Sequence, residues 1–121
     1  MLGVTVADEM FAAIEKGDVD AVGALYAPDI VVWHNTDGIE QTAEQNLRIL
    51  RWLVDNLADR SYDEVRRRDY DDGFVQQHVL RFTYNGTRCE IPACIVATTA
   101  DGRITRIDEY LDSAHISQLV G

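Results

Sequence analysis

The sequence is poor in positive charge and has no long hydrophobic run. Lysine and arginine together number 11, against 21 aspartates and glutamates, which gives a formal net charge of −10 at pH 7. A negative surface repels phosphate backbones and anionic membranes, so we expect neither a nucleic acid nor a membrane as partner. The apolar runs fall far short of the ~20 residues of a membrane span, and the first residues, MLGVTVADEM, lack the features of a signal peptide.

Cysteine and histidine are scarce as well. Cys89 and Cys94 are five residues apart on one expected strand, so their side chains face opposite sides and cannot bridge each other. Two thiols without a disulfide favour a reducing, cytoplasmic location. The three histidines, His34, His78 and His115, are isolated, and no glycine-rich phosphate loop is present, so we expect neither a metal nor a cofactor.

The chain of 121 residues fits a single domain, residues 1–121, and 46% of them are apolar, enough for a folded core. Its second half predicts an antiparallel meander, because Asn85-Gly86 and Asp101-Gly102 mark turns between alternating segments. The strands are expected at residues 61–69, 73–84, 88–99 and 103–112, the first of them a charged edge strand.

The first half predicts helices. They are expected at residues 5–16, 18–26 and 42–58, each opened by a capping residue, with a short strand at residues 30–34. The second helix should end at Ala27-Pro28-Asp29, with Tyr26 on its inner side. This order gives an α+β domain in which the helices cover one face of the sheet.

The strand at residues 88–99 is apolar on both faces. The helices can cover only one face, so a partner subunit is the simplest cover for the other. We therefore expect a homodimer through the outer sheet face, formed by Ile91, Ala93 and Ile95 or by their phase-shifted neighbours. Pro92 cannot donate a hydrogen bond to the ladder, so a bulge is expected there that would shift the phase by one residue.

A resemblance to a known family rests on this order of elements, on the segment GDVDAVGALYAPDIVVWHN and on the ending DGRITRIDEYLD. The whole chain resembles the nuclear-transport-factor-2-like superfamily, in particular its SnoaL-like and ketosteroid-isomerase-like members. The resemblance implies a cone-shaped α+β barrel, in which a curved antiparallel sheet wraps around three N-terminal helices and a central pocket, and often a homodimer. It does not imply one reaction, because the fold hosts isomerases, dehydratases, cyclases, epoxide hydrolases and non-enzymes.

Residue-by-residue comparison narrows the chemistry. At the positions of the carboxylate base and the protonated aspartate of ketosteroid isomerases, this chain has His34 and Cys94, so only the base position keeps a proton acceptor. At the positions of the arginine and two aspartates of limonene epoxide hydrolase, it has Gln76, His78 and Glu109. Scytalone dehydratase and several SnoaL-like proteins use histidines in such pockets and are the closer analogy.

The candidate site contains two histidines. His34 ends the first strand on the same side as Val32, and its imidazole can take a proton from an acidic carbon or a hydroxyl near neutral pH. A structural histidine bonded to the following turn is the alternative. His78 lies in the middle of a strand with Gln76 and Leu80 on its face.

Glu109 is the expected partner of His78 and would hold one imidazole tautomer. This requires that Ile107, Glu109 and Leu111 face inward; the rival phase turns Arg106, Asp108 and Tyr110 inward instead. A buried structural His–Glu pair is the alternative interpretation.

We therefore predict an enzyme of the isomerase, dehydratase or polyketide-cyclase type that uses proton transfer on a small apolar carbonyl or hydroxyl compound. The expected catalytic residues are His34, His78 and Glu109, and the expected ligand-binding residues are Gln76, Val32, Leu80, Cys94 and Trp52. The alternatives are a non-catalytic ligand-binding or dimerisation module of the same fold, and an epoxide-hydrolase-like relative with an altered site.

Overall fold

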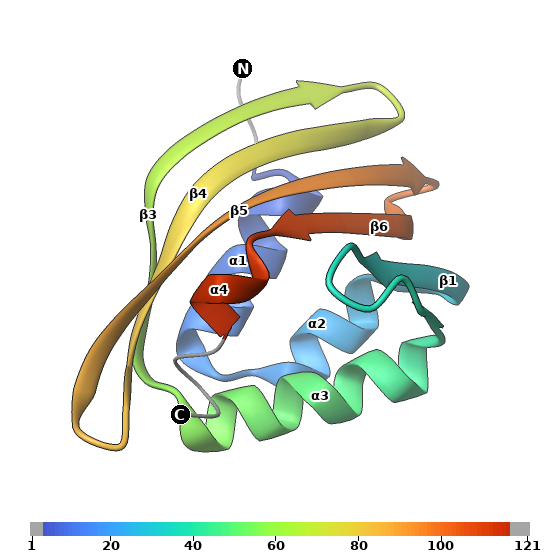
Figure 1. Cartoon of the computed structure of the whole chain (residues 1–121). Helices are drawn as coiled ribbons and strands as arrows, with labels where there is room; N and C mark the ends of the chain where they lie inside the picture. The colour runs from blue at the N-terminus through green and yellow to red at the C-terminus, as the bar shows by residue number, and fades with distance from the viewer. Residues whose placement is uncertain (1–3, 117–121) are drawn as a thin grey trace.

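Three helices lie on the concave side of a six-stranded sheet in the computed structural model, which describes residues 4–116 (Figure 1). The helices are α1 (Val6–Lys16), α2 (Val19–Leu25) and α3 (Ala43–Asn56), and a short α4 (Ser113–Ile116) follows the last strand. The strands, in their order across the sheet, are β2 (Glu40–Gln41), β1 (Tyr26–His34), β6 (Arg103–Leu111), β5 (Thr87–Ala100), β4 (Gly73–Tyr84) and β3 (Ala58–Tyr70). The predicted α+β cone, with 61–69 as an edge strand, is confirmed. Within the described part of the chain, no helix is long and apolar enough to cross a membrane.

Short-range signals set the helix ends. Thr5 and Asp8 form a capping box that starts α1, and Thr42 and Gln45 form another that starts α3. Gly17, with a φ of 82°, ends α1 in the left-handed conformation that glycine adopts without strain.

Tyr26 is buried, as predicted, but it follows the last residue of α2 and begins β1, so its predicted place in the second helix is wrong. Pro28 does not stop this strand, since the pairing of β1 with β6 shifts register between Tyr26 and Val31. A proline is tolerated at such an irregularity because no ladder hydrogen bond is required of it there.

The first and last strands lie side by side and run parallel. Val32 of β1 pairs with Ile107 of β6, and His34 pairs with Glu109. The other long strands form the predicted antiparallel meander. The parallel pairing was not predicted, and it brings the end of the first strand to the end of the last.

Irregular positions curve the edge strand β3. Its register against β4 shifts between Ala58 and Ser61 and again between Asp63 and Arg66. Asp59 and Glu64 lie within these shifts and have positive φ angles of 50° and 53°. Because bulges bend and twist a strand, β3 and β4 wrap around the helices (Figure 1).

The predicted bulge at Pro92 is absent, because the pairing of β4 with β5 is continuous and Pro92 lies opposite Val79. The pairing of β5 with β6 begins only at Ala93, so Pro92 lies where one side of β5 has no partner strand in the described sheet. The phase is therefore unshifted. Ile91 and Ile95 are buried on the inner face, so the outer face presents their neighbours instead.

Two apolar clusters fill the inner face of the sheet. The larger joins α1 and α2 to the sheet and includes Phe74 and Ile107, and the smaller includes Phe82 and Ile91. On β4, His78 lies between the phenylalanines of the two clusters. Polar side chains thus occupy the boundary between the clusters.

Candidate functional site

A row of mostly polar side chains crosses the inner face of the sheet from β3 to β1. Consecutive strands pair at these positions, which are Arg67, Gln76, Ile95, Glu109 and His34. His78 lies two residues farther along β4, on the same face as Gln76. The inward orientation predicted for Gln76 and His78 is confirmed, because they are 1% and 4% exposed and the ring of His78 packs against Phe11 of α1.

His34 and Glu109 form an ion pair at one end of this row. His34 Nε2 lies 2.9 Å from Glu109 Oε1, and the two side chains are 21% and 22% exposed. The hydrogen bond to Glu109 raises the pKa of His34 above its ordinary value, while partial burial opposes this effect. The predicted inward phase of Glu109 is confirmed, whereas Tyr110 lies on the outer face against Trp33.

Asn35 fixes the end of β1 next to this pair. Its amide donates to the carbonyl of Leu111 at 3.0 Å, and its side-chain oxygen accepts from the N–H of Leu111 at 2.9 Å. The Asn35 N–H also donates to the carbonyl of Glu109. The side chain continues the ladder where the strand stops, and this holds His34 beside Glu109.

His78 has a different environment. Its ring centroid lies 4.7 Å from that of Tyr62 and 5.5 Å from that of Phe11, in edge-to-face contacts. Burial lowers the pKa of His78, and the negative charge of Glu109 opposes this only in part. His78 is therefore a neutral imidazole at physiological pH.

The predicted pairing of His78 with Glu109 is wrong. His78 is on β4 and Glu109 is on β6, so two strand spacings of about 10 Å in all separate the two strands, and Glu109 is level with Gln76 and not with His78. Glu109 binds His34, and His78 Nδ1 lies 2.9 Å from the amide nitrogen of Gln76. The strand order thus separates a charged pair from a neutral ring on the same concave face.

Gln76 connects His78 to the edge of the sheet. Its amide oxygen accepts from Arg67 Nη1 at 3.2 Å, and Arg67 also pairs with Asp8 and Asp69. This position orients His78; direct contact of Gln76 with a ligand stays a prediction. Arg67 was missed as a site residue because the run Arg66-Arg67-Arg68 was interpreted as a solvated or ion-paired patch. Simple alternation along β3 does not reveal its orientation, because the register shift between Asp63 and Arg66 changes which residues face inward.

Two tyrosines also belong to the inner surface. Tyr26 donates to Asn46 of α3 at 2.7 Å, and burial together with the charge of Glu109 raises its pKa. The same two causes raise the pKa of Tyr62, which packs against His78. Both phenols therefore stay protonated and can act only as neutral hydrogen-bonding groups.

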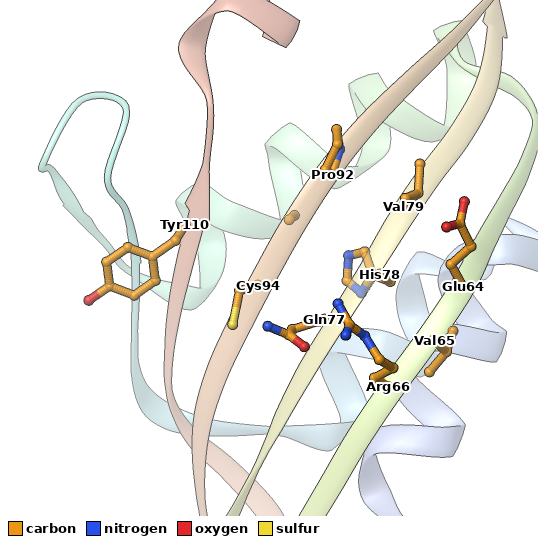
Figure 2. Close-up of a pocket in the computed structure, with 10 residues that line it drawn as sticks. Glu64, Val65, Arg66, Gln77, His78, Val79, Pro92, Cys94 and Tyr110 are labelled. Carbon is orange, nitrogen blue, oxygen red and sulfur yellow. The ribbon is translucent and has the colours of Figure 1, made fainter.

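The predicted ligand-binding residues separate into two groups. Val32 is buried on the inner face and Leu80 packs there beside the smaller cluster, as expected. The prediction that Cys94 binds a ligand on the inner face is wrong, because Cys94 lies on the outer face in a groove of about 620 Å³. Figure 2 shows Cys94, Gln77 and Arg66 projecting from this outer face. Cys94 faces outward because its neighbour Ile95 is buried on the inner face and successive residues of a strand alternate.

The predicted place of Trp52 beside the ligand is also wrong. It is 47% exposed on α3 and its ring lies 6.3 Å from that of Tyr84, so it does not line the polar row. Among residues 4–116, no group of three or more histidine, cysteine, aspartate or glutamate side chains is arranged to hold a metal ion.

Comparison with known protein families gives a match for this chain. The sequence profile of the SnoaL-like domain matches residues 7–107. Among curated proteins, none matches the chain at a significant level.

Solved structures share the fold at low sequence identity. A candidate polyketide cyclase from Xanthomonas campestris superimposes with a TM-score of 0.83 at 19% identity, covering 96% of this chain and 94% of the other. AclR, a candidate hydroxylase from Streptomyces galilaeus, gives 0.83 at 14% identity over 95% and 92%. A nuclear-transport-factor-2-like protein from Burkholderia thailandensis gives 0.78 at 18% identity over 96% and 95%. At these identities the likeness concerns the fold alone.

Proposed function

Because the chain belongs to the SnoaL-like domain family, we propose that it is an enzyme that moves a proton on a small, mostly apolar molecule carrying a carbonyl or hydroxyl group. The pairing of His34 with Glu109 on the concave face carries this proposal. About one-fifth of each side chain is exposed, so a small molecule can reach the pair. The candidate polyketide cyclases among the structural neighbours favour an enzyme over a binding module.

His34 is the proposed base. The Glu109 carboxylate can only accept a hydrogen bond, so the neutral His34 ring carries its proton on Nε2 and offers Nδ1 to the substrate. Nδ1 takes a proton from the carbon next to a carbonyl, and Glu109 stabilises the imidazolium that results.

His78 is the proposed partner on the other side of the substrate. When the proton leaves, the electron pair moves to the carbonyl oxygen, and a neutral imidazole N–H stabilises the charge that develops there. Return of the proton from His34 to another carbon gives an isomer. Its transfer to a neighbouring hydroxyl, which leaves as water, gives a dehydrated product. Attack of the enolate carbon on a second carbonyl, whose oxygen takes the proton, gives a ring.

Hydrogen–deuterium exchange tests the proposal without knowledge of the natural substrate. Cyclic ketones and 1,3-diketones are incubated with the protein in D₂O, and the loss of the proton next to the carbonyl is followed by NMR. We expect catalysed exchange that falls ~10²–10⁴-fold in His34→Ala, the usual contribution of a general base.

Asp108→Asn is the matched control for Glu109→Gln, because Asp108 is the preceding residue of β6 and pairs with Arg106 away from the site. Glu109→Gln should slow exchange and Asp108→Asn should not. Equal rates in wild type and His34→Ala, with native circular dichroism, would overturn the assignment of His34 as the base.

A further inference from the structure

A chain of contacts runs from α1 to the proposed site through four side chains, which are Asp8, Arg67, Gln76 and His78. Arg67 Nη1 donates to Gln76 Oε1 at 3.2 Å, and Gln76 Nε2 lies 2.9 Å from His78 Nδ1. A guanidinium has only donors, so the amide must turn its oxygen toward Arg67 and its NH₂ group toward His78. An NH₂ group only donates, so His78 Nδ1 accepts and the proton of the neutral ring is on Nε2.

The guanidinium is itself held in place from two elements. It forms an ion pair with Asp8 of α1, and its Nε donates to Asp69 Oδ2 of β3 at 3.3 Å. Asp8 is fixed in turn by the capping box with Thr5. The Arg67 side chain is 19% exposed and Gln76 is 1% exposed, so little water can compete for the amide.

We infer that Arg67 is a positioning residue which, through the Gln76 amide, holds His78 as an Nε2–H donor toward the substrate. This inference rests on the proposed function, in which His78 donates a hydrogen bond to the developing oxyanion. Phe11 and Tyr62 pack against the ring and restrict its orientation, and Glu109 is the acidic group across the concave face whose charge acts on it. The chain of contacts thus sets which nitrogen carries the proton, and the aromatic contacts set where it points.

The tautomer can be observed directly by NMR. Protein labelled with ¹⁵N-histidine is studied by long-range ¹H–¹⁵N correlation at a pH above the titration of His78, where the two ring nitrogens give distinct signals. We expect Nδ1 unprotonated and Nε2 protonated in the wild type. A free imidazole in a peptide also favours protonation at Nε2, so the wild-type tautomer alone does not test the inference. The test is the change of tautomer in the variants.

Gln76→Glu should reverse the assignment. A carboxylate beside Arg67 can only accept from the ring, so His78 Nδ1 should become protonated. In Arg67→Met the amide is no longer oriented, and the Nε2–H excess should fall by up to about tenfold, the bias that one ordinary hydrogen bond confers. Arg67→Lys keeps a donor and should restore part of the excess. Arg68→Met is the matched control, because Arg68 is exposed on the opposite face of the same strand.

An unprotonated Nδ1 in folded Gln76→Glu would overturn the inference, as would an unchanged tautomer ratio in Arg67→Met. If Arg67→Met does not fold, Gln76→Glu alone decides. These measurements need no substrate, so their failure leaves the proposed reaction standing, and failure of the exchange assay leaves the tautomer assignment standing.

Discussion

At the scale of single residues, His34 and His78 show how position changes one side chain. Both face the concave side of the same sheet, yet His34 has a carboxylate 2.9 Å away and His78 has an amide at the same distance. The carboxylate stabilises an imidazolium, and burial against aromatic rings disfavours one. The two rings therefore suit opposite tasks, proton transfer for His34 and hydrogen-bond donation for His78.

The two histidines should titrate on opposite sides of the ordinary pKa of about 6.5. In ¹H NMR, the ring protons of His34 should show a midpoint above this value and those of His78 a midpoint below it, because of the causes just given. Glu109→Gln removes the charge that stabilises the imidazolium, so the midpoint of His34 should move to lower pH. A substrate whose reaction uses His34 as base should show a rate that rises with pH through the same midpoint.

Asp108→Asn again serves as the control, and it should leave both midpoints in place. A His34 midpoint that does not respond to Glu109→Gln would contradict the assigned pairing.

At the scale of elements, one arginine joins three segments of the chain. The Arg60 guanidinium, from the start of β3, donates to backbone carbonyls of the last turns of α1 and α3, which belong to Ile14, Glu15, Val54 and Leu57. Carbonyls at a helix C-terminus have no partner within the helix and carry partial negative charge. Arg60 therefore fixes the two helices against the strand that begins the curved wall.

Arg60→Ala should destabilise the protein by roughly 3 kcal/mol, because several charge-assisted hydrogen bonds to partly buried carbonyls are lost. Urea denaturation should show the loss as a lower midpoint. Arg68→Ala, at an exposed position of the same strand, should change stability by less than about 0.5 kcal/mol. An effect of Arg60→Ala as small as that of the control would show that solvent satisfies these carbonyls.

At the scale of the whole molecule, the outer face of the sheet is the surface that the helices leave uncovered. Val96 is 37% exposed and Tyr110 is 47% exposed there, and the groove beside Cys94 lies between β3 and β6. Exposed apolar side chains such as these are a common feature of interfaces between subunits. We propose a homodimer through this face. It would be formed by Cys94 and Val96, which are neighbours of the inward-facing Ile95, and not by the isoleucines themselves.

Val96→Lys should weaken this dimer, because it places a charge in an apolar contact. Size-exclusion chromatography with light scattering should give a dimer for the wild type at micromolar concentration and a larger monomer fraction for the variant. Ile49→Lys is the control, since Ile49 is 46% exposed on α3 on the helical side. A monomeric wild type at that concentration would refute the proposed dimer.

The amino-acid sequence by itself determined most of the elements and the faces of β4. Capping boxes and Asn-Gly or Asp-Gly turns act within a few residues, and alternation with a period of two needs only the pleat of a strand. For this reason the placement of Gln76 and His78 on the inner face could be predicted. The sequence left two phases open for Glu109, and it put Ile91 and Ile95 on the wrong face of β5. The same local rules failed at Pro92 and Tyr26, where the neighbouring strand decides whether a proline interrupts pairing.

Only the tertiary structure decided which polar groups meet. The parallel pairing of β1 with β6 joins residues 75 positions apart, so His34 receives Glu109 and His78 does not. The pairing of β3 with β4, together with the packing of α1, brings Arg67 and Asp8 to Gln76. Hydrogen bonds reach about 3 Å, whereas a sequence pattern fixes only the face of a strand and not its neighbour across the sheet. The positions of Gln76 and His78 on the inner face could therefore be predicted from the sequence, whereas Arg67 and the pairing of the polar groups followed from the strand order.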